Sequence, residues 1–161
     1  MKNELLRELF FTLAMIEIIQ ATEKNIEEVV PLFDEYRVFY KQEGNIVAAR
    51  NFITERLTNK ESIIFLAYFK GQPAGFTQLY PMFSSVSMQR SYVLNDLYVH
   101  PSYRNKQLGE ALLNTAKEFC TANHAKGLSL ETAIDNPAQK LYEKLGWEKD
   151  EACFHYFWNA K

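Results

Sequence analysis

The sequence predicts a single domain of the mixed α/β (α+β) class, in which helices cover the faces of one sheet. The chain has 161 residues, which is the usual length of one domain. Hydrophobic residues make up 47% of it and charged residues 24%, so it can build a core. Short β-prone runs alternate with stretches of helical spacing, and this order is typical of a sheet flanked by helices.

The first fourteen residues are predicted to be an N-terminal extension, and residues 15–161 form the domain. Four leucines in the extension have the spacing of a short amphipathic helix, for docking or a dimer contact. The alternative is a dispensable leader, because termini are often loosely held. Acidic residues stand where a signal peptide is basic, and the apolar stretch is too short to cross a membrane.

The first half of the domain is predicted to begin with a strand over Ile16–Ile19. Thr22 then provides an N-cap, and a helical pattern follows as far as Tyr36. Pro31 lies inside that pattern and predicts a kink or a later start of the helix. A second helix is predicted over Ile46–Leu57.

The second half alternates strands with helices and begins with a hairpin that turns at a lysine-glycine pair. The predicted elements are Ser62–Phe69 and Pro73–Tyr80 for the hairpin, a strand over Tyr92–Val99, a helix over Leu108–Asn123, a strand over Lys126–Thr132, a helix over Asn136–Leu145 and an aromatic strand over Phe154–Trp158.

A basic loop joins the strand that ends at Val99 to the helix that follows. A helix N-terminus exposes N–H groups and partial positive charge, which together favour phosphate. Arg104 and Lys106 add charge, and Gly109 allows close approach of the backbone. The loop therefore resembles a pyrophosphate cradle, although it matches neither the P-loop nor the Rossmann pattern. The alternative is a solvated loop before an ordinary helix.

Two longer motifs connect this loop to a known family. The stretch LNDLYVHPSYRNKQLGEALL, residues 94–113, resembles motif A of the GNAT superfamily of acyl-CoA-dependent N-acetyltransferases. The stretch DNPAQKLYEKLGW, residues 135–147, resembles motif B of the same family. The resemblance covers residues 16–158 and is strongest to the branch that acetylates small amines such as polyamines. It implies a mixed, mostly antiparallel central sheet flanked by helices, with a splay between the two central strands.

The resemblance implies acetyl-CoA as co-substrate and assigns the residues that hold it. Asn136, which can also cap its helix, is expected to bond the pantetheine arm. The backbones expected along the pantetheine arm belong to Leu97, Tyr98 and Val99, and those around the pyrophosphate belong to Arg104, Asn105, Lys106, Gln107, Leu108 and Gly109. Gln107 replaces the family's first glycine, so a positive φ there would cost about 1 kcal/mol.

Catalytic roles are expected for Tyr142 and Asp96. The resemblance places Tyr142 near the CoA sulfur, where it protonates the departing thiolate; the alternative is a tyrosine packed in the core. Asp96 is a candidate base for the amine, and Glu131 and His100 are weaker candidates. For Asp96 the alternative is a structural hydrogen-bonding role at a kink in its strand. Asn95 stands where polyamine-type relatives often carry Glu.

The resemblance builds the acceptor side from the first two helices and the loop after Tyr80. Aromatic and acidic side chains there suit a cationic amine with an apolar stem. The acids serve equally well as solvated helix faces, and two arginines leave an acceptor with a carboxylate open. The residues considered are Tyr36, Tyr40, Tyr80 and Glu131 for the substrate site, with Asp34, Glu35, Glu43, Arg37 and Arg90 around them.

We therefore expect transfer of an acetyl group from acetyl-CoA to the primary amine of a small molecule, by direct attack in a ternary complex. The alternatives are a protein or peptide N-acetyltransferase and a non-catalytic acyl-CoA-binding sensor domain.

The net charge of −2 disfavours nucleic-acid binding, and no histidine, cysteine and carboxylate cluster has zinc-like spacing. Cys120 and Cys153 form no C-x-x-C pair, so we expect buried thiols and a cytoplasmic location. The resemblance implies a homodimer, because family members often pair through their last strands. The aromatic tail Phe154–Trp158 would serve there; the alternative is that it belongs to the core.

Overall fold

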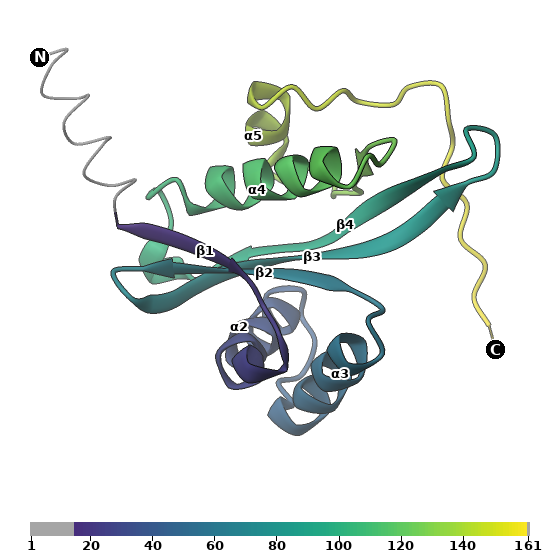
Figure 1. Cartoon of the computed structure of the whole chain (residues 1–161). Coiled ribbons are helices and arrows are strands. Elements are labelled where there is room, and N and C mark those ends of the chain that lie inside the picture. Colours follow the sequence, from purple (N-terminus) through teal and green to yellow (C-terminus); the bar gives the residue numbers. More distant parts are fainter. Residues whose placement is uncertain (1–14, 161) are drawn as a thin grey trace, which may run out of the picture. The chain divides into compact units, whose positions relative to one another are not determined.

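The computed structural model describes residues 15–160, which form two compact units. We call residues 15–131 the sheet unit and residues 132–160 the C-terminal unit, and each is described by itself (Figure 1). The predicted extension and its amphipathic helix lie outside the described residues. Among residues 15–160, no helix combines the length and apolar character that a membrane crossing requires.

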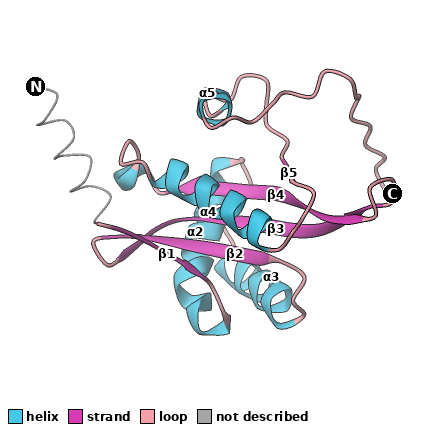
Figure 2. Cartoon of the chain, turned by 45° about the horizontal axis from the view of Figure 1, so that its top comes forward, coloured by secondary structure: helices cyan, strands magenta, loops and turns pink. Residues whose placement is uncertain are grey.

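The sheet unit contains one five-stranded sheet whose strands follow one another in chain order. The first four strands pair antiparallel, and β5 pairs parallel to β4. This mixed, mostly antiparallel sheet confirms the predicted fold class. The strands are β1 (Ile16–Gln20), β2 (Ile63–Phe69), β3 (Gln72–Ser84), β4 (Gln89–Val99) and β5 (Leu128–Ser129). The strands β3 and β4 form a long antiparallel ribbon (Figure 2).

Helices cover both faces of this sheet. Figure 1 shows α2 and α3 on one face and α4 on the other. Pro31 lies inside α2 without ending it, although it is past the first turn and lacks the N–H that would bond within the helix. The helices are α2 (Ile26–Phe39), α3 (Ile46–Thr58) and α4 (Leu108–Ala122), with short 3₁₀ turns η1 (Glu23–Asn25) and η2 (Pro101–Tyr103).

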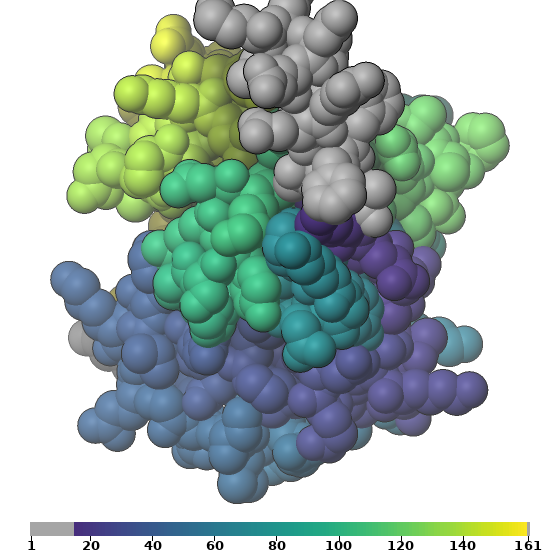
Figure 3. Space-filling model, turned by 90° about the vertical axis from the view of Figure 1, so that its left-hand side faces the viewer, coloured from purple at the N-terminus to yellow at the C-terminus, as the bar shows by residue number. Residues whose placement is uncertain are grey.

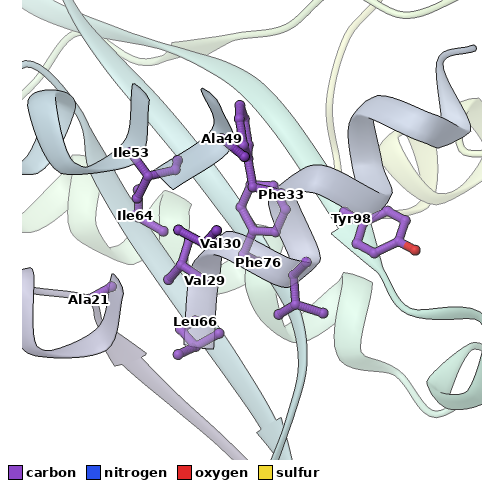
Figure 4. Close-up of a cluster of buried hydrophobic side chains, with 11 residues drawn as sticks. Ala21, Val29, Val30, Phe33, Ala49, Ile53, Ile64, Leu66, Phe76 and Tyr98 are labelled. Carbon is purple, nitrogen blue, oxygen red and sulfur yellow. The ribbon is translucent and has the colours of Figure 1, made fainter. Parts of the chain in front are cut away.

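The core between the sheet and the α2–α3 pair is largely aromatic and aliphatic (Figure 4). Phe33 of α2 stacks on Phe52 of α3, with ring centroids 5.4 Å apart. Phe76 of β3 is fully buried and meets Phe33 edge-on at 6.1 Å. Burying a phenylalanine side chain contributes about 1.5–3 kcal/mol, so these contacts hold the helices on the sheet.

A β-bulge in β4 changes which face of the sheet its side chains occupy. Gln78 pairs with Asp96, but the next residue of β3 pairs with Leu94, so Asn95 is an extra residue. Before the bulge, Tyr92 contacts Phe119 of α4, with ring centroids 5.4 Å apart. After it, Tyr98 contacts Tyr36 of α2 at 6.2 Å. The bulge therefore directs the side chain of Asp96 toward α2, because side chains otherwise alternate strictly along a strand.

The C-terminal unit holds one short helix, α5 (Gln139–Lys144). It begins later than the predicted Asn136, whose side-chain oxygen accepts the N–H of Ala138 and forms a turn. The predicted strand over Phe154–Trp158 is wrong: these residues form no strand, and their aromatic side chains are exposed. Within residues 15–160 no strand pairs with them, and a strand without a partner gains no ladder of hydrogen bonds.

Candidate functional site

The strand β4 has an open edge where the pantetheine arm was predicted to lie. β5 pairs only with Tyr92 and Val93, and no other strand of the described chain pairs with that edge. The predicted residues Leu97, Tyr98 and Val99 lie along this part of β4. An open edge presents backbone N–H and C=O groups that an amide-containing chain can pair with.

The buried side chain of Tyr98 fixes this part of β4 to helix α2. Its hydroxyl donates to Glu35 of α2 at 3.2 Å, and the ring is 6% exposed. Burial, reinforced by the charge of Glu35, raises the pKa of Tyr98 to about 12, so the hydroxyl keeps its proton. On the paired side of β4, a Cβ on Gly75 would lie 2.5 Å from the carbonyl oxygen of Tyr98. The close approach of β3 and β4 therefore requires glycine at this position.

The loop after β4 leads directly into α4 through two left-handed residues. His100 Nδ1 accepts the N–H of Ser102 at 3.2 Å and caps the turn η2. Asn105 has φ 60° and Gln107 has φ 63°. The predicted positive φ at Gln107 is thus present, although the residue is not glycine. The Gln107 side chain makes no capping hydrogen bond to α4.

The basic side chains of the loop fold back over its base. Arg104 Nε donates to the carbonyl oxygen of Val99 at 3.2 Å, and Lys106 Nζ donates to that of Ser102 at 3.0 Å. Lys106 Nζ also lies 5.6 Å from the ring centroid of Phe69, at the end of β2. Figure 3 views this end of the sheet unit, where the β2–β3 turn, in teal, lies beside the loop, in green.

The residues present fit the pyrophosphate and pantetheine of CoA. The start of α4 offers helix N–H groups without a side-chain cap from Gln107, and the loop before it carries Arg104 and Lys106. Leu108 is 1% exposed, so its side chain anchors the helix in the core and only its backbone can face a ligand. Gly109 adds no side chain within the first turn. This donor set suits a doubly charged anion at the end of the open edge.

Asp96, directly after the bulge, is the most deeply buried carboxyl considered in the sequence analysis, with 4% exposure. Its Oδ2 accepts from Gln78 Nε2 at 2.8 Å, and its Oδ1 accepts from Asn95 Nδ2 at 3.1 Å. Burial raises the pKa of Asp96, and hydrogen bonds from Tyr36, Gln78 and Asn95 oppose that rise. The carboxyl is therefore a better proton acceptor than an exposed aspartate.

Three predicted substrate residues gather on the same face as Asp96. Tyr36 hydrogen-bonds Asp96, and its ring packs edge-on against Tyr40 with centroids 5.0 Å apart. The hydroxyl oxygen of Tyr80 accepts from Gln78 at 2.7 Å. Burial, with the nearby charge of Asp96, raises the pKa of Tyr80 to about 12. The structure thus joins two of the tyrosines to the candidate base through hydrogen bonds.

Three other predicted residues are described by their own surroundings. Glu131 is exposed, two residues beyond β5, at the end of the sheet unit. Tyr142 lies on α5 of the C-terminal unit, where its ring is 6.1 Å from that of Trp147. Asn136, in the same unit, caps the turn before α5. Their roles toward base, thiolate and pantetheine remain predictions.

Several charged residues of the predicted acceptor side have structural partners. Asp34 accepts from Arg37 at 3.2 Å and from the N–H of Asn45 at 2.8 Å, which ties the α2–α3 loop. Glu35 accepts from Tyr98 and lies 3.7 Å from His100 Nε2. Both carboxylates therefore have structural partners, beyond the solvated helix faces that were the alternative. His100 follows the last residue of β4 directly.

The expectation of two buried thiols is half correct. Cys120 is buried in α4, and burial raises the pKa of its thiol. Cys153 is exposed; it directly precedes the predicted strand Phe154–Trp158, which does not form. A buried thiol that stays protonated is a poor nucleophile, which disfavours an acyl-cysteine at Cys120.

Sequence reasoning missed Gln78, which hydrogen-bonds Asp96, and Ser62, which hydrogen-bonds Gln78. Ser62 Oγ donates to Gln78 Oε1 at 3.1 Å, and Gln78 is completely buried. The available signal was a glutamine inside the apolar run of a strand, since such a residue needs partners when it is buried.

Comparisons with known proteins test the predicted family. The sequence model of the Acetyltransferase (GNAT) family matches residues 26–147. An uncharacterised N-acetyltransferase of Bacillus subtilis is 46% identical over 146 residues, covering 90% of this chain and 98% of its own.

Solved structures give the same result. The crystal structure of a probable acetyltransferase superposes with a TM-score of 0.86 at 37% identity, covering 90% of this chain and 98% of the other. An aminoglycoside N-acetyltransferase in complex with CoA has a TM-score of 0.74 at 20% identity, covering 90% and 95%, and so shares the fold. With the family match spanning both motifs and a relative close to half identical, this chain belongs to the GNAT family of acetyltransferases.

Proposed function

We propose that the protein transfers an acetyl group from acetyl-CoA to the primary amine of a small molecule, by direct attack within a ternary complex. The observation that carries this proposal is the open edge of β4. At one end it meets the buried carboxyl of Asp96, and at the other it meets the positive start of α4. A pantetheine arm that pairs along this edge would extend from a pyrophosphate at the start of α4 to a thioester near Asp96.

Acetyl-CoA, when bound, supplies an activated acetyl group as its thioester. The stretch Leu97–Val99 pairs with the pantetheine amides through the backbone groups of Leu97 and Val99, because the carbonyl of Tyr98 faces Gly75 of β3. Asn136 contributes its side-chain amide. The pyrophosphate is held by the stretch from Arg104 to Gly109, through backbone N–H groups and two cations. Because the contacts are mostly main-chain, binding depends more on the backbone path than on side-chain identity.

The acceptor amine must lose a proton as it attacks. Asp96 takes that proton, directly or through one water, and its raised pKa brings it closer to the amine it serves. Tyr36, Tyr40 and Tyr80 form an aromatic wall for the apolar stem of the amine, and Glu131 is the predicted second carboxylate. A C–N bond forms, the C–S bond breaks, and Tyr142 gives its proton to the departing thiolate.

The acceptor is proposed to be a small molecule because aromatic rings surround a single buried carboxyl here. Such a site recognises one ammonium group and a short apolar stem.

The cytoplasmic location and the homodimer remain predictions from the sequence. Size-exclusion chromatography with light scattering tests the homodimer.

The proposal is tested by measuring free-thiol release from acetyl-CoA with polyamines, amino acids, aminoglycosides and a lysine peptide. We expect release with one class of small amine. Asp96→Asn is expected to lower kcat at least 100-fold, and Tyr142→Phe to lower it to a smaller degree, with CoA affinity unchanged. Release with the peptide alone would make the protein a peptide N-acetyltransferase. CoA binding without release from any acceptor would favour the sensor domain.

A further inference from the structure

A chain of buried hydrogen bonds runs behind the acceptor side of the site. Ser62 Oγ donates to Gln78 Oε1 at 3.1 Å. Gln78 Nε2 then donates to both Asp96 Oδ2 at 2.8 Å and the hydroxyl oxygen of Tyr80 at 2.7 Å. Ser62 is 7% exposed, Gln78 is fully buried and Asp96 is 4% exposed, so the bonds among these three residues are shielded from solvent.

The chemistry of these groups fixes the direction of every bond. An ionised carboxylate only accepts, so Gln78 must present its NH₂ group to Asp96. Its carbonyl oxygen then faces Ser62, whose hydroxyl donates. Both protons of the amide are used, one by Asp96 and one by the oxygen of Tyr80. The hydroxyl proton of Tyr80 therefore points away from Gln78.

The position of Gln78 in the sheet makes this arrangement possible. It lies directly opposite Asp96, at the register shift where Asn95 forms the bulge. Phe76, two residues earlier on the same face of β3, is an ordinary core residue. A buried amide costs free energy unless it is bonded, and an apolar residue would fill this position without that cost. A glutamine here is therefore explained by the groups that it orients.

We propose that Gln78, held by Ser62, is a positioning residue that fixes the Asp96 carboxylate and the Tyr80 hydroxyl toward the acceptor amine. This inference rests on the proposed role of Asp96 as the base. Gln78 does not touch the reacting atoms. It holds one oxygen of Asp96 by a charge-assisted bond and occupies one lone pair of Tyr80, so both groups meet the acceptor in one orientation.

Other titratable and charged groups face this cluster, and they bear on any pH measurement. Tyr36 of α2 bonds Asp96, and Tyr80 of β3 lies beside it. Arg56 of α3 and Glu61, in the loop before β2, act on Tyr80 with opposite signs. Arg56 and Glu61 also pair with each other at 2.6 Å, so their charges largely offset one another.

The test compares three variants by two independent readouts. Gln78→Met keeps the volume and removes the amide, and Ser62→Ala removes the donor that fixes its orientation. Thr77→Val is the matched control: Thr77 is equally buried on β3 and donates to the backbone oxygen of Asp96, but it lies outside the chain of bonds. The first readout is the pKa of Asp96 by carbon-13 NMR without any acceptor. The second is the pH profile of kcat/KM with acetyl-CoA and spermidine.

In Gln78→Met we expect the pKa of Asp96 and the acid limb of kcat/KM to move together to higher pH by about one unit. Ser62→Ala should move both in the same direction by less. Thr77→Val should lower the melting temperature and leave both unchanged.

Two results would overturn the inference. One is an unchanged pKa of Asp96 in Gln78→Met. The other is a shifted pKa with an unshifted acid limb, which would make Gln78 a structural partner only. Failure of the proposed function is distinguishable, because it removes acetyl transfer in the wild-type protein and leaves the NMR readout intact.

Discussion

At the scale of single residues, Asp96 shows how burial prepares a carboxyl for its function. It follows the bulge at Asn95, is nearly inaccessible and accepts hydrogen bonds from three side chains. The raised pKa means that the folded state favours the protonated form more than the unfolded chain does. Ionised Asp96 therefore costs stability, which is expected where a group is placed for chemistry.

The sign of this effect gives a prediction for stability against pH. A carboxyl with a raised folded-state pKa contributes stability that is complete below its unfolded pKa, and this stability is lost as the pH rises through its folded pKa. In urea unfolding, the free energy of wild type minus that of Asp96→Asn should fall as the pH rises from about 3.8, and then become level. Curves that stay parallel from pH 3.5 to 8 would show that Asp96 is not perturbed.

At the scale of elements, the loop that leads into α4 ends in a glutamine with left-handed backbone geometry, which a residue with a Cβ disfavours. Gln107 has φ 63° and makes no capping bond. Left-handed geometry costs about 1–2 kcal/mol in a residue with a Cβ, whereas glycine adds entropy to the unfolded chain. A change from glutamine to glycine therefore relieves strain in the folded state and adds entropy to the unfolded state. The relief of strain is the larger effect.

Gln107→Gly should therefore stabilise the protein by about 0.5–1 kcal/mol in urea unfolding. Gln107→Ala is the matched control, because alanine keeps the Cβ and the strain. It should bring no such gain. Equal stability of the glycine and alanine variants would contradict the assignment of strain to this residue.

The pairing of β3 with β4 depends on Gly75 in a different way. A Cβ at this position would lie 2.5 Å from the carbonyl oxygen of Tyr98. Because that oxygen belongs to the backbone, β4 itself must shift to make room. Gly75→Ala should cost about 1–3 kcal/mol and weaken CoA binding, because β4 moves with the carbonyl. Gly127→Ala has nothing within 4 Å of its new Cβ and should change the unfolding free energy by less than about 0.5 kcal/mol. Similar losses in both variants would contradict the steric argument.

At the scale of the whole molecule, local patterns predicted the elements well, and long-range pairing explains the rest. The hairpin, the two helices before it and the helix that begins at Leu108 all form as their periodicity indicates. A kink in this strand was one alternative considered for Asp96, but the exact position of the bulge at Asn95 depends on the register of two strands and was not predictable from local patterns. The partnership of Gln78 with Ser62 and Asp96 has the same origin, since the residues are 16 and 18 positions apart.

The C-terminal unit shows the opposite limit of sequence patterns. Phe154–Trp158 has the composition of a strand, but composition alone does not supply a neighbour to pair with. The position of Tyr142 on a short helix follows from its motif, while its role depends on the arrangement of acetyl-CoA between groups far apart in the sequence. The sequence motif therefore identifies Tyr142 as a candidate, whereas the geometry of the C-terminal unit by itself does not.

The central claim is that an amine takes the acetyl group directly from acetyl-CoA. It is tested most directly by mass spectrometry of a reaction with acetyl-CoA and the amine that releases most thiol. The account predicts equal amounts of acetylated amine and free CoA, with no acetyl group on the protein when the amine is left out. Acetylated protein that forms without amine and then passes its acetyl group on, or thiol release without acetylated amine, would contradict it.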